Sequence, residues 1–214
     1  MKKRLAVLIA GLALISCNSA LTVDSNRVVV RISDQSRVRI EPVSEKIFRV
    51  SAVPAGAKFS KRPSLMRSPE DLPSVPFECT EEENFVNVKT RSVTARVDRR
   101  TGEVVFLDEE GNVVLQENEG GGKSFSPIEV EGDKGYTVRQ VFESPADEAF
   151  YGLGQHQSDE FNYKGKNETL YQYNTKVSVP FIVSGKNYGL LWDNNSLTRF
   201  GDPRDYLQLD VLNL

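Results

Sequence analysis

The sequence predicts an all-β fold, an antiparallel β-sandwich, from three observations. Short runs of β-branched and aromatic residues recur along the chain, and in several of them apolar residues stand at alternate positions, as in Val93–Val97. Gly, Asn, Asp and Pro separate these runs and predict turns. No long stretch combines the 3.6-residue period of a helix with capping residues. Many short strands at even spacing are typical of sandwiches and barrels.

The predicted strands follow one another with short connections. They are 27–32, 37–40, 47–53, 86–88, 93–97, 104–107, 113–115, 136–142, 177–183, 188–192 and 206–209. Asp108–Asn112 predicts a hairpin turn with a glycine able to adopt positive φ. Ala55–Pro76, rich in proline and charge, is expected to run over the surface, and the acidic, glycine-rich Glu117–Gly122 is expected to be a mobile loop.

The N-terminus has the pattern of an export signal. Lys2, Lys3 and Arg4 precede an unbroken apolar run, Leu5–Ile15, which is too short to span a bilayer. The run ends in Leu14-Ile15-Ser16-Cys17, which resembles a bacterial lipobox and implies cleavage before Cys17 and lipidation of that residue. A plain secretory signal with an incidental cysteine is the alternative. We expect residues 1–16 to be a signal peptide, 17–25 a linker and 26–214 the sandwich, in an exported, lipid-anchored protein of the cell envelope.

Composition narrows the functional classes. The chain has 214 residues and a formal net charge of −3, and losing residues 1–16 would remove three basic side chains and no acid. This acidic balance argues against a nucleic-acid partner, because such binding depends on phosphate neutralisation. With one histidine, His156, and two cysteines, the chain has no ligand set for a metal site, and no cofactor motif is found. Cys79 has no neighbouring histidine and is expected to be a small half-buried apolar residue.

The most informative block runs from Phe150 to Asp205. It contains Phe150-Tyr151-Gly152-Leu153-Gly154-Gln155-His156, then Tyr171-Gln172-Tyr173-Asn174-Thr175, then Ser178-Val179-Pro180-Phe181, and finally Tyr188-Gly189-Leu190-Leu191-Trp192-Asp193-Asn194. The two glycines of the first motif let a strand bend or approach another backbone closely. The loop that follows is rich in amides, hydroxyls and aromatic rings. Such a β scaffold would present a polar, aromatic rim to a neutral polar ligand such as a sugar.

This ordered set resembles the N-terminal domain of glycoside hydrolase family 31, and within it the bacterial α-xylosidases. The resemblance implies a galactose-mutarotase-like β-sandwich packed on a (β/α)8 barrel. In the family the barrel supplies an Asp nucleophile and an Asp general acid, and the reaction retains configuration. No barrel motif stands in residues 1–214, and the apolar C-terminal segment Asp205–Leu214 ends without a turn. We therefore expect a chain truncated before the barrel, which contains no catalytic residue and is inactive alone.

The resemblance also implies a substrate-contacting loop. In the family a loop of the sandwich reaches over the barrel mouth, and by motif position it ends here at Asn174 and Thr175. Asn174 is the first candidate, with Thr175, Gln172 and Lys176 beside it, because a neutral amide suits vicinal hydroxyls. A strand-end turn held by side-chain to backbone bonds is the alternative for Asn174-Thr175. Trp192 and His156 are expected to be packing residues rather than ligands of the sugar.

Three functions are left open. The first is the scaffold domain of an α-glycosidase, of α-xylosidase type, acting on α-xylosyl or other α-glycosyl ends of oligosaccharides such as xyloglucan fragments. Its partners would be the oligosaccharide, the barrel and, through Cys17, a membrane. The second is a free-standing carbohydrate-binding envelope lipoprotein. The third is a structural envelope β-sandwich.

Overall fold

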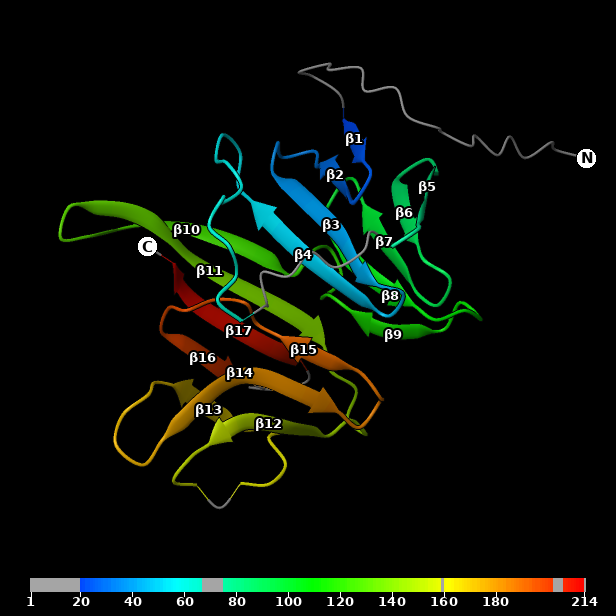
Figure 1. The fold of residues 1–214 in the computed structure, drawn as a ribbon. Helices are drawn as coiled ribbons and strands as arrows, with labels where there is room; N and C mark the ends of the chain where they lie inside the picture. The colour runs from blue at the N-terminus through cyan, green and yellow to red at the C-terminus, as the bar shows by residue number, and fades with distance from the viewer. Residues whose placement is uncertain (1–19, 67–74, 159, 202–205, 214) are drawn as a thin grey trace, which may run out of the picture.

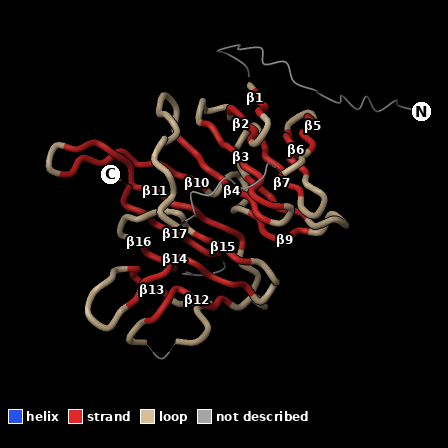
Figure 2. The backbone as a smooth tube through the Cα atoms, viewed as in Figure 1, coloured by secondary structure: helices blue, strands red, loops and turns tan. Residues whose placement is uncertain are grey.

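The computed structural model describes residues 20–66, 75–158, 160–201 and the backbone of 206–213. Strands and loops make up this part of the chain, and it contains no helix (Figure 2). The all-β prediction is therefore confirmed. The strands are β1 (Leu21–Asp24), β2 (Arg27–Arg31), β3 (Arg37–Ser44), β4 (Ile47–Val53), β5 (Glu78–Glu81), β6 (Phe85–Lys89), β7 (Thr94–Asp98), β8 (Val104–Leu107), β9 (Val113–Gln116), β10 (Lys123–Val130), β11 (Asp133–Glu143), β12 (Phe150–Gln155), β13 (Asn167–Leu170), β14 (Val177–Ser184), β15 (Gly189–Leu191), β16 (Thr198–Gly201) and β17 (Tyr206–Asn213).

The first half of the chain forms two antiparallel sheets that pack face to face. One has the order β1-β2-β3-β4 and the other β5-β6-β7-β8-β9 (Figure 1). Valine and isoleucine alternate along these strands, so one face of each sheet is apolar. The residues buried between the sheets are Val28, Val30, Ile32, Val38, Ile40, Val86, Val88, Ala95, Val97 and Val104.

The second half forms another pair of sheets, with the orders β10-β11-β17-β16-β13 and β12-β14-β15. The core between them contains more aromatic residues than the first. Phe150 and Phe200 are fully buried with their ring centroids 6.5 Å apart, and Tyr163 packs edge-on against Phe200. Phe106 of β8 packs against both cores and so joins the two halves.

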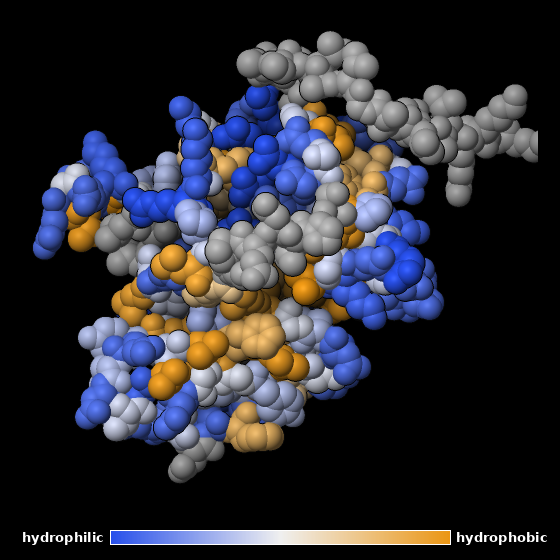
Figure 3. Space-filling model, in the orientation of Figure 1, coloured by the Kyte–Doolittle hydropathy of each residue, from blue (hydrophilic) through white to orange (hydrophobic). Residues whose placement is uncertain are grey.

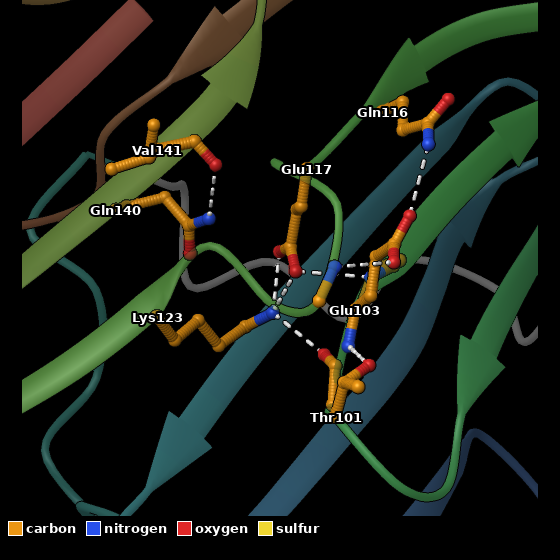
Figure 4. A network of polar contacts seen from close by, with 10 residues as sticks. Thr101, Glu103, Gln116, Glu117, Lys123, Gln140 and Val141 are labelled. Carbon is orange, nitrogen blue, oxygen red and sulfur yellow. Dashed lines mark hydrogen bonds and ion pairs between the residues drawn. The ribbon is translucent and has the colours of Figure 1, made fainter.

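The loop between β9 and β10, expected to be a mobile loop, packs closely against the rest of the fold. Glu117 is buried, accepts a hydrogen bond from Val104 N at 2.9 Å and contacts the ammonium group of Lys123 (Figure 4). A Cβ atom on Gly121 would lie 2.6 Å from Thr101 O, and one on Gly122 would overlap Val141 O. An acidic, glycine-rich run looks solvated in sequence, but here the glycines permit close backbone packing and Lys123 neutralises the acid.

The ends of the predicted sandwich also differ from expectation. Leu21–Asp24, placed in the expected linker 17–25, forms β1 and pairs with β2 along its whole length. β17, which contains the predicted strand 206–209, pairs with β11 on one side and β16 on the other. Residues 1–19, including Cys17, lie outside the described residues.

The surface excursion after β4 is confirmed as irregular over residues 54–66 and is held against β3. Phe59 lies beneath two guanidinium groups, those of Arg37 and Arg39, at 5.3 and 4.6 Å from the ring centroid. Ser64 Oγ donates to Asp193 Oδ1 at 2.7 Å, and Arg49 Nη2 lies 2.9 Å from Asp193 Oδ2. These contacts tie the first half of the chain to the segment that follows β15.

Candidate functional site

The site begins at an irregularity in β12. Gly152, Leu153 and Gly154 all have positive φ, at 123°, 64° and 93°, and the register between β12 and β14 shifts at this point. A Cβ atom on Gly152 would lie 2.5 Å from Phe181 O, and one on Gly154 would overlap Val177 O. The predicted role of the two glycines in close backbone approach is confirmed. The bulge turns Leu153 into the core, where it is 1% exposed.

His156 lies directly after this bulge and is enclosed by it. Its side chain is 1% exposed, and Nε2 lies 2.7 Å from Leu153 O. Nδ1 lies 3.4 Å from Glu168 Oε1, on β13. The prediction that His156 is a packing and hydrogen-bonding residue beside the glycine turn is confirmed.

Glu168 connects the bulge to the loop between β13 and β14. Its Oε1 lies 3.0 Å from Lys176 Nζ, and this hydrogen bond, with the charge of Glu168, raises the pKa of Lys176. The Lys176 ammonium also lies 5.7 Å from the ring centroid of Tyr173. Lys176, predicted as a sugar ligand, therefore has partners within the protein.

Tyr173–Lys176 forms a tight turn, which we call the rim turn. Lys176 N donates to Tyr173 O at 2.9 Å, and Thr175 has a φ of 68°. Gln157 Nε2 donates to Thr175 Oγ1, so the Thr175 hydroxyl is occupied within the fold. Asn174 and Gln172 are exposed, and both lie on the loop that joins β13 to β14 (Figure 1).

Two tyrosines beside the rim turn were not singled out from the sequence. Tyr171 and Tyr173 are 58% and 48% exposed, and their ring centroids lie 5.6 Å apart with an interplanar angle of 35°. Their i, i+2 spacing in an extended segment was the available signal, because such residues share a face. The four candidate residues therefore lie together in one loop, with an exposed aromatic pair among them.

The sheet β12-β14-β15 exposes apolar side chains on one face, which we call the outer face. Phe181 and Leu191 are cross-strand partners, and Phe181 packs over Gly189. Figure 3 shows apolar side chains gathered over β14 and β15. The exposed apolar residues of these two strands are Val177, Val179, Phe181, Val183 and Leu191.

The residues after β15 contact the second core and β14. Trp192 packs against the second core, as predicted, and its backbone N donates to Pro180 O at 2.8 Å. Asn194 Oδ1 accepts from Ser196 N at 2.8 Å and so forms the turn.

The described residues contain no group of three or more His, Cys, Asp or Glu side chains placed to hold a metal ion. No helix long and apolar enough to cross a membrane occurs among them. Cys79 is half-buried against the first core, as predicted, and burial raises its pKa to about 11.

Comparison with known proteins identifies the family. Residues 37–200 match the model of the glycosyl hydrolase 31 N-terminal galactose mutarotase-like domain. The chain belongs to this family. The glycosyl hydrolase 31 resemblance inferred from the motifs at 150–194 is thus confirmed, as is the galactose-mutarotase-like sandwich.

The similar proteins include α-xylosidases. A crystal structure of a family 31 α-xylosidase from Xanthomonas citri superposes with a TM-score of 0.78 at 47% identity, over 85% of this chain and 20% of that one. A family 31 α-xylosidase from a soil metagenome gives 0.76 at 26% identity, over 90% and 30%. An α-xylosidase of Saccharolobus solfataricus is 33% identical over 135 residues, 59% of this chain and 18% of its own. This glycosyl hydrolase 31 domain therefore spans less than a third of the length of each of these relatives.

Proposed function

We propose that this chain is the N-terminal domain of an α-glycosidase of α-xylosidase type. The enzyme would hydrolyse α-xylosyl or other α-glycosyl ends of oligosaccharides such as xyloglucan fragments. A (β/α)8 barrel would carry its catalytic carboxylates, and this domain would support the barrel and contact the sugar. Family membership and the 47% identity to the Xanthomonas citri α-xylosidase support this assignment.

The observation that carries the sugar-binding role is the composition of the rim. Tyr171 and Tyr173 expose their rings next to Gln172 and Asn174, which are also exposed. Aromatic faces can stack on the C–H faces of a sugar ring, while an amide offers two donors and an acceptor to its hydroxyls. Thr175 and Lys176, engaged by Gln157 and Glu168, would hold the turn.

The outer face of β12-β14-β15 suits a permanent protein partner. Monomeric proteins rarely leave such a contiguous apolar surface uncovered. We assign this face to the barrel, because the chain covers only 20% and 30% of the two α-xylosidase structures and the face lies on the same sheet as the rim.

We also infer export and lipid anchoring at Cys17, from the lipobox-like Leu14–Cys17. Metabolic labelling with a fatty acid, comparing the natural protein with Cys17→Ala, tests this inference. Label and membrane association should both be lost in the variant. Unchanged membrane association would contradict it.

The activity is tested with the protein encoded by the complete reading frame. It should release xylose from p-nitrophenyl α-xyloside and from xyloglucan oligosaccharides. The 214-residue chain should bind these oligosaccharides without hydrolysing them, because the proposal places both catalytic carboxylates in the barrel. Hydrolysis by this chain alone, or inactivity of the complete protein on every α-glycoside, would overturn the proposal. Sugar binding without any hydrolase activity would favour the carbohydrate-binding lipoprotein instead.

A further inference from the structure

Positive charge is concentrated in the first sheet and the excursion that follows it. Residues 20–66, which include β1 to β4, contain nine basic and four acidic side chains. Residues 75–214 contain fourteen basic and twenty-four acidic ones. The formal net charge is therefore +5 for the first segment and −10 for the second.

The first sheet displays arginine on the side that faces away from its core. Valine and isoleucine fill the core at alternate positions of β2 and β3, so the residues between them point outward. Three carboxylates on this side, those of Asp24, Glu41 and Asp193, lie 2.7, 3.0 and 2.9 Å from guanidinium nitrogens. The guanidinium groups outnumber them, because the outward residues include Arg27, Arg31, Arg37, Arg39 and Arg49.

The excursion after β4 adds positive charge to the same side. Phe59 packs against the guanidinium groups of β3 and so places the excursion over the outward side of the sheet. Lys58, Lys61 and Arg62 are exposed, and none of them pairs with an acidic residue of the described part of the chain. Figure 3 shows hydrophilic side chains gathered over β2 to β4. We call these three residues and the five outward arginines the basic face.

The inferred lipid anchor lies close to this face along the chain. Four residue steps separate Cys17 from Leu21, where β1 begins, and an extended chain spans at most about 14 Å over that length. β1 is the edge strand of the sheet that bears the basic face. The Debye length at physiological ionic strength is about 8 Å, so the anchor would hold this sheet within about two Debye lengths of the headgroups.

We propose that the basic face binds anionic phospholipid headgroups and lays the first sheet against the bilayer to which Cys17 is anchored. Each Lys or Arg close to an anionic leaflet strengthens binding about fivefold. The same surface repels the acidic residues from 75 onward, so attraction and repulsion together orient the domain. This orientation rests on the inferred anchor, whereas headgroup binding by the basic face needs neither the anchor nor a sugar.

Vesicle sedimentation tests the basic face without the anchor. The chain is produced from residue 17 onward with Cys17→Ser, so that neither the apolar run 5–15 nor an acyl chain contributes, and it contains every described residue. It should sediment with vesicles of equal parts phosphatidylglycerol and phosphatidylcholine, and not with vesicles of phosphatidylcholine alone. Binding should be lost at about 1 M salt, where the Debye length shortens to about 3 Å.

A pair of triple variants locates the binding surface. Lys58→Glu with Lys61→Glu and Arg62→Glu reverses three charges of the basic face and should weaken binding to the anionic vesicles at least tenfold. The matched control reverses three exposed charges elsewhere, changes the net charge equally and should bind nearly as well as the unsubstituted chain; it is Lys89→Glu with Lys134→Glu and Lys166→Glu. Circular dichroism checks that both variants are folded.

Three results would overturn the proposal. The first is equal binding to both kinds of vesicle, or equal loss in the two triple variants. The second is self-association through the basic face without vesicle binding, which would assign the face to the acidic side of a second copy. The third is vesicle binding by this chain that the protein from the complete reading frame lacks, which would show that the rest of the enzyme covers the face.

These measurements use no sugar and no hydrolysis, so the basic face can fail while the proposed α-glycosidase function stands. Fatty-acid labelling of Cys17 tests the anchor separately, and oligosaccharide titration tests the rim.

Discussion

The ammonium group of Lys123 contacts both carboxylate oxygens of Glu117 and lies 3.1 Å from the carbonyl oxygen of Gly102. Both side chains are nearly inaccessible, at 12% and 4% exposure. Burial raises the pKa of Glu117 even though Lys123 opposes that effect. This ion pair lies where β9 leaves the first half of the chain and β10 enters the second.

Removing one partner of this pair should be costly. Lys123→Met leaves a buried carboxylate without its cation and should lower the free energy of unfolding by about 3–5 kcal/mol, measured by urea denaturation. The double variant Glu117→Leu with Lys123→Met should recover most of the loss, because it buries no charge. A single variant as stable as the unsubstituted protein would show that the pair is not buried in solution.

The bulge in β12 should tolerate no side chain at Gly154. Gly154→Ala places a Cβ atom against Val177 O at a φ of 93°, so we expect a loss of about 3 kcal/mol or more in unfolding free energy. Gly165→Ala is the control, because Gly165 has a φ of 70° but nothing within 4 Å of the added atom. It should lose only about 1 kcal/mol, from backbone conformation alone. Equal losses in the two variants would argue against the close approach of β12 and β14.

Asp98 should make stability depend on pH. Burial alone would raise its pKa, but hydrogen bonds from the Arg100 backbone, at 2.7 Å, and side chain outweigh burial and lower the pKa. A lowered pKa in the folded state stabilises the protein above the unfolded-state pKa of about 4, and this stabilisation is lost as pH falls through the folded-state pKa. Asp98→Asn should therefore cost about 1–2 kcal/mol at pH 7 and progressively less below pH 4.

Urea denaturation at several pH values measures this difference. Asp133→Asn, at the exposed start of β11, is the control and should change stability little at any pH. A pH-independent difference for Asp98→Asn would contradict the electrostatic origin of the effect.

Cys79 should react slowly. Because burial raises its pKa to about 11, only a small fraction is thiolate near pH 8. Alkylation by iodoacetamide, followed for the Cys79 peptide by mass spectrometry, should be at least tenfold slower in the folded chain than in urea. Equal rates in the two states would show that the thiol is accessible.

The rim residues should affect sugar binding without affecting the fold. Tyr173→Ala and Asn174→Ala should each weaken oligosaccharide binding about tenfold, by loss of stacking or of hydrogen bonds. Tyr136→Ala, on the β10–β11 hairpin where Tyr136 packs edge-on against Phe125, is the control and should leave affinity unchanged. Titration calorimetry measures the affinities, and circular dichroism checks that each variant is folded. Equal loss in all three variants would place binding elsewhere.

Strands whose apolar and polar side chains alternate could be predicted from the sequence alone. Val86 and Val88 alternate with polar residues, so one buried face was readable without a partner. β10, β13 and β16 were not predicted, because their sequences are polar or interrupted, as Pro127 interrupts β10. These segments are strands because their backbones pair with neighbouring strands. β10 pairs with β11 over eight residues, and β13 pairs with β16.

By itself the sequence determined the all-β class, the family and the loop that holds Asn174. These depend on residue types at short spacing along the chain, such as Gly152 and Gly154 or the Tyr171–Thr175 motif. Only the tertiary structure decided that Glu117 is buried rather than solvated, that Lys176 is engaged by Glu168, and that His156 lies between Leu153 O and Glu168. The physical reason is that burial and charge pairing depend on which strands become neighbours, and residues far apart in sequence meet only when the sheets close.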